Sequence, residues 1–219
     1  MSQESVAEIV GKLRFVSSSA PAIYLNERLV SEMFVSQLGA IESFTRTAAR
    51  EMAGEAGAGG FVKVGGSRAG TQQVDYDLKE PLTQALVLHS ALGSQGGVQP
   101  VRADLTRGTY IEAIGEAYLP DLGIPGHPLM GLDDTVAALE AERDRQQQVI
   151  QAFGNTAIPL ILLIMKNEST LSAAVINRLH FRPEVAASYL GGPQVAFGLM
   201  EGSIANVPLF TLLYMRPYL

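Results

Sequence analysis

Acidic side chains alternate along one short stretch of the chain, and their spacing could support metal chemistry. In "VDYDL", Asp75 and Asp77 stand two residues apart. If this stretch is a strand, both carboxylates point to the same face, because side chains alternate between the two faces. Together with Asp104 they could hold a divalent cation through oxygen ligands and serve a metal-dependent hydrolase. Alternating acids are also typical of the wet face of an antiparallel strand, and the sequence favours that interpretation.

A second group combines arginine with an aromatic side chain. Arg102, Arg107 and Tyr110 lie on or between two predicted strands, and Glu112 follows closely. Arginine beside an aromatic ring can bind an anion or stack on a base. The group therefore predicts a small anionic ligand or a nucleotide, although surface ion pairing explains the same residues equally well.

A third candidate is a glutamine within an apolar helix face. A helical wheel drawn from residue 27 places Gln37 in the middle of the half that carries Leu29, Val30, Met33, Phe34, Leu38 and Ile41. A buried amide without partners costs roughly 1–3 kcal/mol, so Gln37 must be bonded. The favoured interpretation is a tie to a neighbouring backbone segment. The alternative is a side chain that faces a pocket.

Other catalytic arrangements are missing from the sequence. The chain has no cysteine, which excludes disulfides, thiol catalysis and cysteine-based metal sites. Its three histidines form no H-x-x-x-H pair, and no G-x-S-x-G motif is present. The glycine-rich stretch 54–73 lacks the phosphate-loop pattern, and its "GAGG" precedes a predicted strand instead of following one. We therefore predict no catalytic residue and no cofactor.

Composition and charge restrict the class of protein. Of 219 residues, 47% are hydrophobic and 17% charged, which is typical of a globular chain with a sizeable core. The net charge is −6 and no basic stripe is visible, so binding to a nucleic-acid backbone or an acidic membrane is disfavoured.

The opening "MSQESVAEIVGKLRF" lacks the pattern of a signal peptide. The longest apolar run, "AIPLILLIM" at 157–165, is far shorter than the roughly 20 residues of a membrane helix. We expect a soluble cytoplasmic protein in which this run is a buried strand.

The elements that would position these residues follow from periodicity and from turn signals. Helices are predicted over 5–13, 27–38, 81–93, 134–153, about 169–179, and 183–190. Strands are predicted over 23–25, 61–64, 74–78, 98–105, 109–119, 158–165, 194–200 and 207–214, with a hairpin turn at Arg107 and Gly108 and a bulge at Gly115. This order favours an α+β fold with a mainly antiparallel sheet built from hairpins and packed against several helices.

One segment is the clearest break in the chain. "PDLGIPGHPLMG", residues 120–131, holds three prolines and three glycines. It suggests an N-terminal α+β region over 1–130 and a C-terminal helix–strand region over 131–219, unless the two form one continuous domain.

The predicted helix 134–153 has an unusual middle. Its "EAERDRQQQ" segment has almost no apolar face. A solvated helix face is the usual fate of such a mixed charge run. The alternative is a contact with a protein partner or with a second copy of the chain.

The "YLNE" at 24–27, followed by a helix to "QL" at 37–38, resembles the opening of an uncharacterised family of bacterial domains. That family begins with a Y-L-D-E strand, followed by a helix, a glycine-rich stretch and a hairpin, and the resemblance covers residues 22–92. Asn26 stands where the family has Asp, and either residue can cap a helix. The resemblance implies a bacterial soluble domain without catalytic residues, in which Tyr24, Asn26, Glu27 and Gln37 are capping and packing positions.

Taken together, these patterns predict a non-enzymatic bacterial module that binds a partner protein or a small ligand. Two alternatives stay open. One is a metal-dependent hydrolase that uses surface aspartates, and the other is a regulator that binds a nucleotide or anion through Arg102, Arg107 and Tyr110.

Overall fold

The computed structural model describes residues 21–39, 80–122, 131–154, 158–168, 170–189 and 192–218. The chain divides into two compact units, one of Met1–Ala20 and Glu27–Gly97, the other of Pro21–Asn26 and Val98–Leu219. The predicted helix 5–13, the strands 61–64 and 74–78, and the carboxylates of Asp75 and Asp77 lie outside the described residues.

In the first unit, two helices pack against each other: α2 (Glu27–Leu38) and α4 (Pro81–Ser94). Proline suits the first turn of α4 because its missing N–H would have no helical partner there. Gln84 of α4 is only 2% exposed, and its Oε1 accepts a hydrogen bond from the Ser31 hydroxyl of α2 at 2.8 Å. The buried amide that ties α2 to a neighbour is therefore Gln84.

Gln37 is exposed on α2, so the prediction of a buried amide at this position is wrong. The helix ends at Leu38, and Gly39 follows with a φ of 85°. Ile41, which widened the apolar half of the wheel, lies outside the described residues. The buried residues of α2 are Val30 and Phe34, which stand one turn apart.

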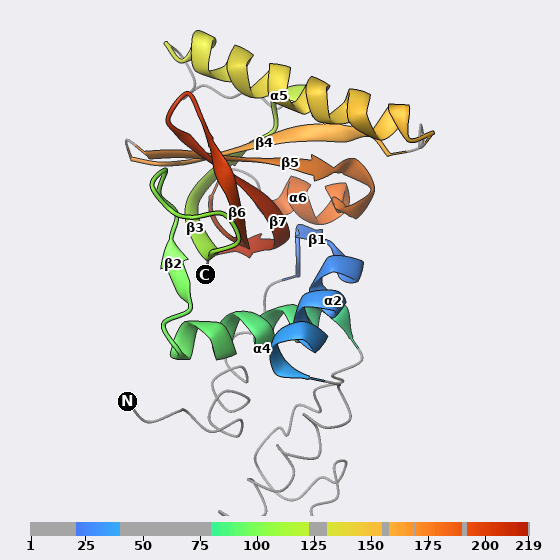
Figure 1. Cartoon of the computed structure of the whole chain (residues 1–219), viewed down its shortest axis with the longest axis vertical. Helices are drawn as coiled ribbons and strands as arrows, with labels where there is room; N and C mark the ends of the chain where they lie inside the picture. The colour runs from blue at the N-terminus through green and yellow to red at the C-terminus, as the bar shows by residue number, and fades with distance from the viewer. Residues whose placement is uncertain are drawn as a thin grey trace, which may run out of the picture. The chain divides into compact units, whose positions relative to one another are not determined.

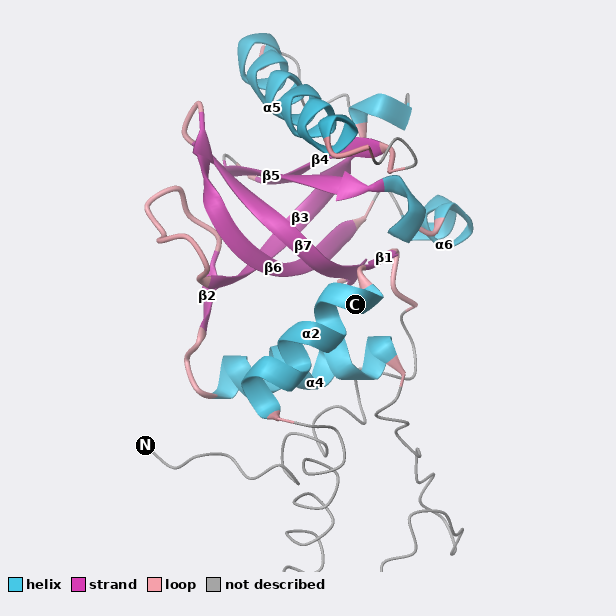
Figure 2. Cartoon of the chain, turned by 45° about the vertical axis from the view of Figure 1, so that its right-hand side comes forward, coloured by secondary structure: helices cyan, strands magenta, loops and turns pink. Residues whose placement is uncertain are grey.

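The second unit is built on a seven-stranded sheet. Its strands are β1 (Tyr24–Leu25), β2 (Val98–Pro100), β3 (Tyr110–Tyr118), β4 (Leu160–Asn167), β5 (Thr170–Asn177), β6 (Pro193–Ile204) and β7 (Val207–Pro217). Five of them close into a barrel in the order β3, β6, β7, β5, β4 and back to β3 (Figures 1 and 2). All these pairs are antiparallel except β5 with β7. The α+β class with a mainly antiparallel sheet is confirmed, and its closure is a further finding.

The barrel contains a Greek key. Strands β3, β4 and β5 are neighbours in chain order, and β6 returns to lie beside β3. Strand β2 adds to β3 in parallel, with Val98 opposite Tyr110. The hairpin predicted through Arg107 and Gly108 is therefore wrong. A longer connection turns back at Gly108, which has a φ of 83° and donates its N–H to the Met200 carbonyl.

The helix predicted over about 169–179 is also wrong, because residues 170–177 of this range form β5. A turn at Glu168, with a φ of 48°, folds β5 back on β4, and the Thr170 hydroxyl bonds the Asn167 carbonyl at 2.7 Å. Ala173 and Ala174 favour a helix locally, but the pairing of this segment with β4 along its whole length makes it a strand. Ala174 packs into the barrel interior and Ala173 into the apolar cluster outside it.

The barrel interior holds the main core. Its members come from every barrel strand and include Ile111, Leu163, Ile176, Met200 and Leu212. Phe181 and Ala186 join this cluster from the segment that leads into α6 (Pro183–Tyr189) and from α6 itself. The run predicted as a buried strand at 157–165 thus supplies β4, and its interior side chains are Ile161, Leu163 and Met165.

A long helix, α5 (Asp133–Ala152), covers the outside of β4 and β5 (Figures 1 and 2). Its buried residue Leu139 packs with Leu162, Ile164 and Ala173. Because β3 pairs with both β4 and β6, a division of the chain at residue 130 would cut the sheet. The chain instead passes between its two compact units after Ala20, after Asn26 and after Gly97.

Gly115 marks the point where β3 passes from β6 to β4. Its register with β6 is unbroken, with Gly115 opposite Gln194, so the predicted bulge is wrong. Close approach of two backbones explains the glycine, because a Cβ at this position would lie 2.4 Å from the Lys166 carbonyl oxygen.

Replacing Gly115 by alanine should therefore destabilise the barrel. We expect Gly115→Ala to lower the free energy of unfolding by about 1–3 kcal/mol, because the neighbouring strand must move to admit the methyl group. Urea unfolding followed by circular dichroism measures the change. Gly93→Ala is the control, since its methyl group would meet nothing within 4 Å and alanine favours a helix. Equal stability of Gly115→Ala and wild type would contradict the account.

Candidate functional site

One edge of β4 lacks a strand partner over half its length. β4 pairs with β5 from Leu160 to Asn167 but meets β3 only from Ile164 to Lys166. Gln147 of α5 covers the open part. Its Oε1 accepts from the Leu160 N–H at 2.9 Å, and its Nε2 donates to the Ile158 carbonyl at 3.1 Å. One side-chain amide thus supplies the acceptor and donor that a further strand would have offered.

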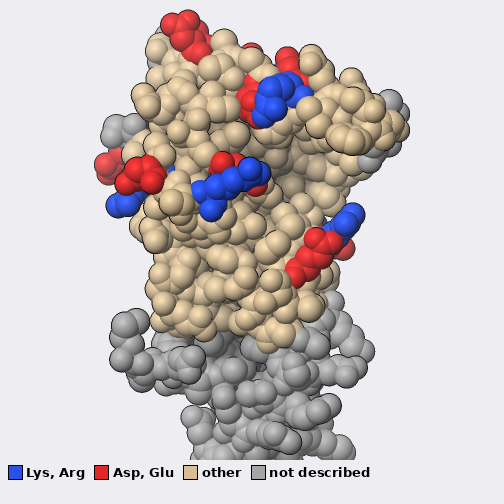
Figure 3. Space-filling model, in the orientation of Figure 1, with Lys and Arg blue, Asp and Glu red and all other residues tan. Residues whose placement is uncertain are grey.

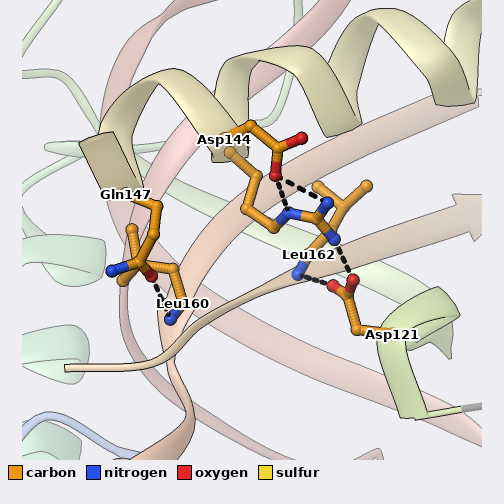
Figure 4. Close-up of polar contacts among 6 residues, drawn as sticks. Asp121, Asp144, Gln147, Leu160 and Leu162 are labelled. Carbon is orange, nitrogen blue, oxygen red and sulfur yellow. Dashed lines mark hydrogen bonds and ion pairs between the residues drawn. The ribbon is translucent and has the colours of Figure 1, made fainter. Parts of the chain in front are cut away.

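Asp121 continues this cover from the short helix η1 (Pro120–Leu122). One carboxylate oxygen accepts from the Leu162 N–H at 2.6 Å, and the other forms an ion pair with Arg143 of α5 (Figure 4). The side chains of Arg143 and Asp121 are only 18% and 21% exposed. Arg143 is held further by Asp144 at 2.8 Å. The polar middle of α5 is therefore not wholly solvated, because Arg143 and Gln147 face the barrel.

A cavity of about 650 Å³ lies between α5 and the β6–β7 hairpin. On α5 the lining residues recur every three or four positions, which places them on one face of the helix. The lining is made of Arg107, Glu142, Arg145, Gln146, Val149, Ile150, Glu201, Gly202, Ser203, Ile204, Leu209 and Thr211. We call this space the α5–hairpin cavity.

One ion pair in the cavity belongs to α5. Arg145 donates two hydrogen bonds to the Glu142 carboxylate, from Nε to Oε2 at 2.7 Å and from Nη2 to Oε1 at 2.5 Å. Gln146 donates to the same carboxylate at 2.9 Å. The hydrogen bond from Arg145 lowers the pKa of Glu142. Glu142 is therefore a fixed anion that holds the guanidinium of Arg145 in one orientation.

The other ion pair joins a loop to the hairpin. Arg107 reaches Glu201 at 2.9 Å, and the Thr211 hydroxyl donates to Glu201 at 2.7 Å. Glu201 is the extra residue of a bulge in β6, because Met200 lies opposite Phe210 while Gly202 lies opposite Leu209. Bulges of this kind re-aim a side chain. Here the bulge contributes a carboxylate to the cavity.

The residues predicted to bind a ligand are not gathered at one place. Arg107 lines the α5–hairpin cavity, but Arg102 is exposed in an ion pair with Asp104 at 3.1 Å. Tyr110 stacks on Phe197, with ring centroids 5.7 Å apart. Gln37 belongs to the other unit.

Of the predicted metal ligands, only Asp104 is described, and it pairs with Arg102. Within the described parts of the chain, no three His, Asp or Glu side chains cluster closely enough to hold a metal ion. Sequence reasoning missed Glu142, Arg145 and Glu201. The Glu142–Arg145 spacing of three was a visible signal for an ion pair on a helix, but it names no cavity.

A smaller cavity of about 260 Å³ lies near the β4–β5 turn and β2. Its described lining residues carry one carboxylate, Glu112, and include Asn167, Thr170 and Ser172, but no Lys or Arg. On the face shown in Figure 3, acidic and basic side chains lie in small mixed groups without a basic stripe. The α5–hairpin cavity thus combines the larger volume with the charged groups.

Tyr24, Leu25 and Asn26 of the "YLNE" stretch belong to the second unit and have a structural role there. Tyr24 is 2% exposed, and burial raises its pKa to about 12, although hydrogen bonds from the Asn177 backbone and the Asn26 side chain oppose this shift. Its ring meets His180 edge to face at 6.0 Å. β1 pairs with β7, and Tyr24 also ties it to Asn177 at the end of β5. Tyr24 and Asn26 do not belong to the cavity lining.

Comparison of the chain with protein-family models, curated proteins and solved structures finds no match. Among the described residues, no helix has the length and apolar character needed to cross a bilayer.

Two neighbouring glutamines on α5 provide a matched test of how this helix is held. Gln147→Ala removes the bonds to Ile158 and Leu160 at the start of β4 and should lower the free energy of unfolding by about 1–3 kcal/mol, because these partly buried backbone groups lose their partners. Gln148→Ala should change it by less than about 0.5 kcal/mol, since this side chain is exposed. Urea unfolding of both variants measures the difference. Two equal values would show that Gln147 does not hold α5.

Proposed function

We propose that the protein is a non-catalytic binding module whose ligand site is the α5–hairpin cavity. The observation that carries this proposal is a cavity with apolar side chains and two preformed ion pairs. Its volume lies within the range of about 300–1,000 Å³ that is common for small-molecule sites. Both of its walls are held in place, one by the bonds of α5 to β4 and the other by the pairing of β6 with β7.

The lining supports binding rather than turnover. A general base must accept a proton, and the best candidate, Glu142, already receives three hydrogen bonds and has a lowered pKa. The Thr211 hydroxyl donates to Glu201, and the described lining residues include no histidine to activate it. The charged groups are therefore arranged to hold one another and a ligand.

A fold-level analogy bears on the position of the site. Five-stranded Greek-key barrels of the OB type bind oligonucleotides and oligosaccharides on the face of their second and third strands and through flanking loops. Here the second and third barrel strands are β4 and β5, whose outer face α5 covers with apolar contacts. With that face covered, a ligand beside α5 at the β6–β7 hairpin is favoured over a nucleic acid laid across the sheet.

A second candidate function is a protein contact through the C-terminal end of α5. Val149 and Phe153, one turn apart, are 46% and 86% exposed. Exposed apolar groups near a rim of charges favour a partner protein or a second copy of the chain. Such a contact would raise the mass in solution above the 23.4 kDa of one chain. The absence of cysteine supports a bacterial cytoplasmic location for either function.

Ligand binding at the cavity can be tested with a fragment set. Neutral, anionic and cationic aromatic fragments, added to ¹⁵N-labelled protein, should shift the amide signals of Gln146–Ile150 and Glu201–Ile204. Gln146→Trp should abolish these shifts because the indole fills the cavity, whereas Gln148→Trp should retain them because its side chain is not part of the lining. Shifts confined to other surfaces, or shifts unchanged in Gln146→Trp, would refute the proposed site.

A further inference from the structure

Hydrogen-bond donors at the α5–hairpin cavity are largely unused. A guanidinium group carries five N–H donors. Arg145 donates to Glu142 through Nε and Nη2, and Arg107 donates to Glu201 through Nη2 alone. Most of the donors on these two side chains therefore have no partner among the residues that the structure describes. Their side chains are 66% and 80% exposed, so an entering molecule can reach them.

The acceptors are, by contrast, mostly engaged. A carboxylate can accept about four hydrogen bonds. Glu142 accepts two from Arg145 and one from Gln146, and Glu201 accepts from Thr211 and Arg107. Their side chains are only 13% and 34% exposed. The two arginines and the two glutamates of the cavity balance in formal charge. The arginine side chains are nevertheless the more exposed, so a ligand that enters the cavity contacts hydrogen-bond donors rather than acceptors.

Apolar surface adjoins these donors. Val149 and Ile150 line the cavity from α5, and Ile204 and Leu209 line it from the hairpin. Val149 remains 46% exposed, so its surface is open to a ligand. Covering such surface is favourable by about 25 cal/mol per Å². A ligand that satisfied both kinds of surface would join an anionic group to an apolar body.

Given the binding role proposed above, we infer that the α5–hairpin cavity binds an amphipathic anion. Its carboxylate or phosphate oxygens accept hydrogen bonds from Arg145 and Arg107, and its apolar part lies against Val149, Ile150, Ile204 and Leu209. Glu142 acts as a positioning residue, because its two bonds fix the guanidinium of Arg145 before the ligand arrives. That pre-orientation reduces the side-chain entropy lost on binding.

Four probes with the same apolar chain test the inference: octanoate, octyl phosphate, octylammonium and octan-1-ol. Their binding to the full chain is measured by isothermal titration calorimetry at one ionic strength. Octanoate or octyl phosphate should bind at least about tenfold more tightly than octylammonium and octanol, because hydrogen bonds between a guanidinium and an anionic oxygen are stronger than those between neutral groups. Tighter binding of either anion supports the inference. The anion that binds more tightly, octanoate or octyl phosphate, identifies the preferred head group as carboxylate or phosphate.

Variants connect the preference to the named residues. Arg145→Gln should remove most of the preference for the anion. Arg178→Gln should retain it, because Arg178 is exposed, lies outside the cavity lining and changes the net charge equally. If Arg145→Gln does not fold, Arg107→Gln serves in its place, since that side chain is 80% exposed.

The outcomes separate this inference from the proposed function. If octylammonium or octanol binds as tightly as octanoate and octyl phosphate, the inferred preference for anions is wrong, but the proposed binding role is not affected. An anion preference that survives both arginine variants would overturn the assignment to these residues. Absence of binding by all four probes, with fragments also failing to shift the cavity, would overturn both.

Discussion

The packing of α5 against the barrel depends on one edge of β4, which pairs with β3 over only three residues. A buried strand edge without partners costs about 1–3 kcal/mol for each unsatisfied group. β3 leaves β4 after three residue pairs, so Leu160 and Leu162 need other acceptors. Gln147 and Asp121 supply them. This need explains why α5, which buries only Leu139 among its residues, lies against the barrel.

Once α5 is fixed in this way, the position of the cavity follows. The helix face next to Arg143 and Gln147 carries Glu142, Arg145, Gln146, Val149 and Ile150 toward the β6–β7 hairpin. On the hairpin, a bulge presents Glu201 and lets it pair with Arg107. Two departures from regular structure, an incomplete strand pairing and a bulge, thus build a charged and apolar site on an otherwise ordinary barrel.

The parts of the fold that sequence could predict are those set by local signals. Proline at the start of α4, acidic residues at the start of α5 and the apolar run of β4 each act within a few residues. β5 could not be predicted, because Ala173 and Ala174 favour a helix until β4 offers a partner. The sequence could not predict the cavity either, because Arg107, Arg145 and Glu201 are brought together only by the closure of the barrel. Arg107 was the one predicted ligand-binding residue that the structure places in its lining.

The central claim is that side chains of α5 and η1 replace a missing strand along β4. Hydrogen exchange of the Leu160 and Leu162 amides, followed by NMR, tests it most directly. The account predicts protection close to that of the Ile164 amide, which lies where β4 is paired on both sides. Exchange of Leu160 and Leu162 at the rate of open surface amides would contradict it, because Gln147 and Asp121 would then not be bonded to this edge.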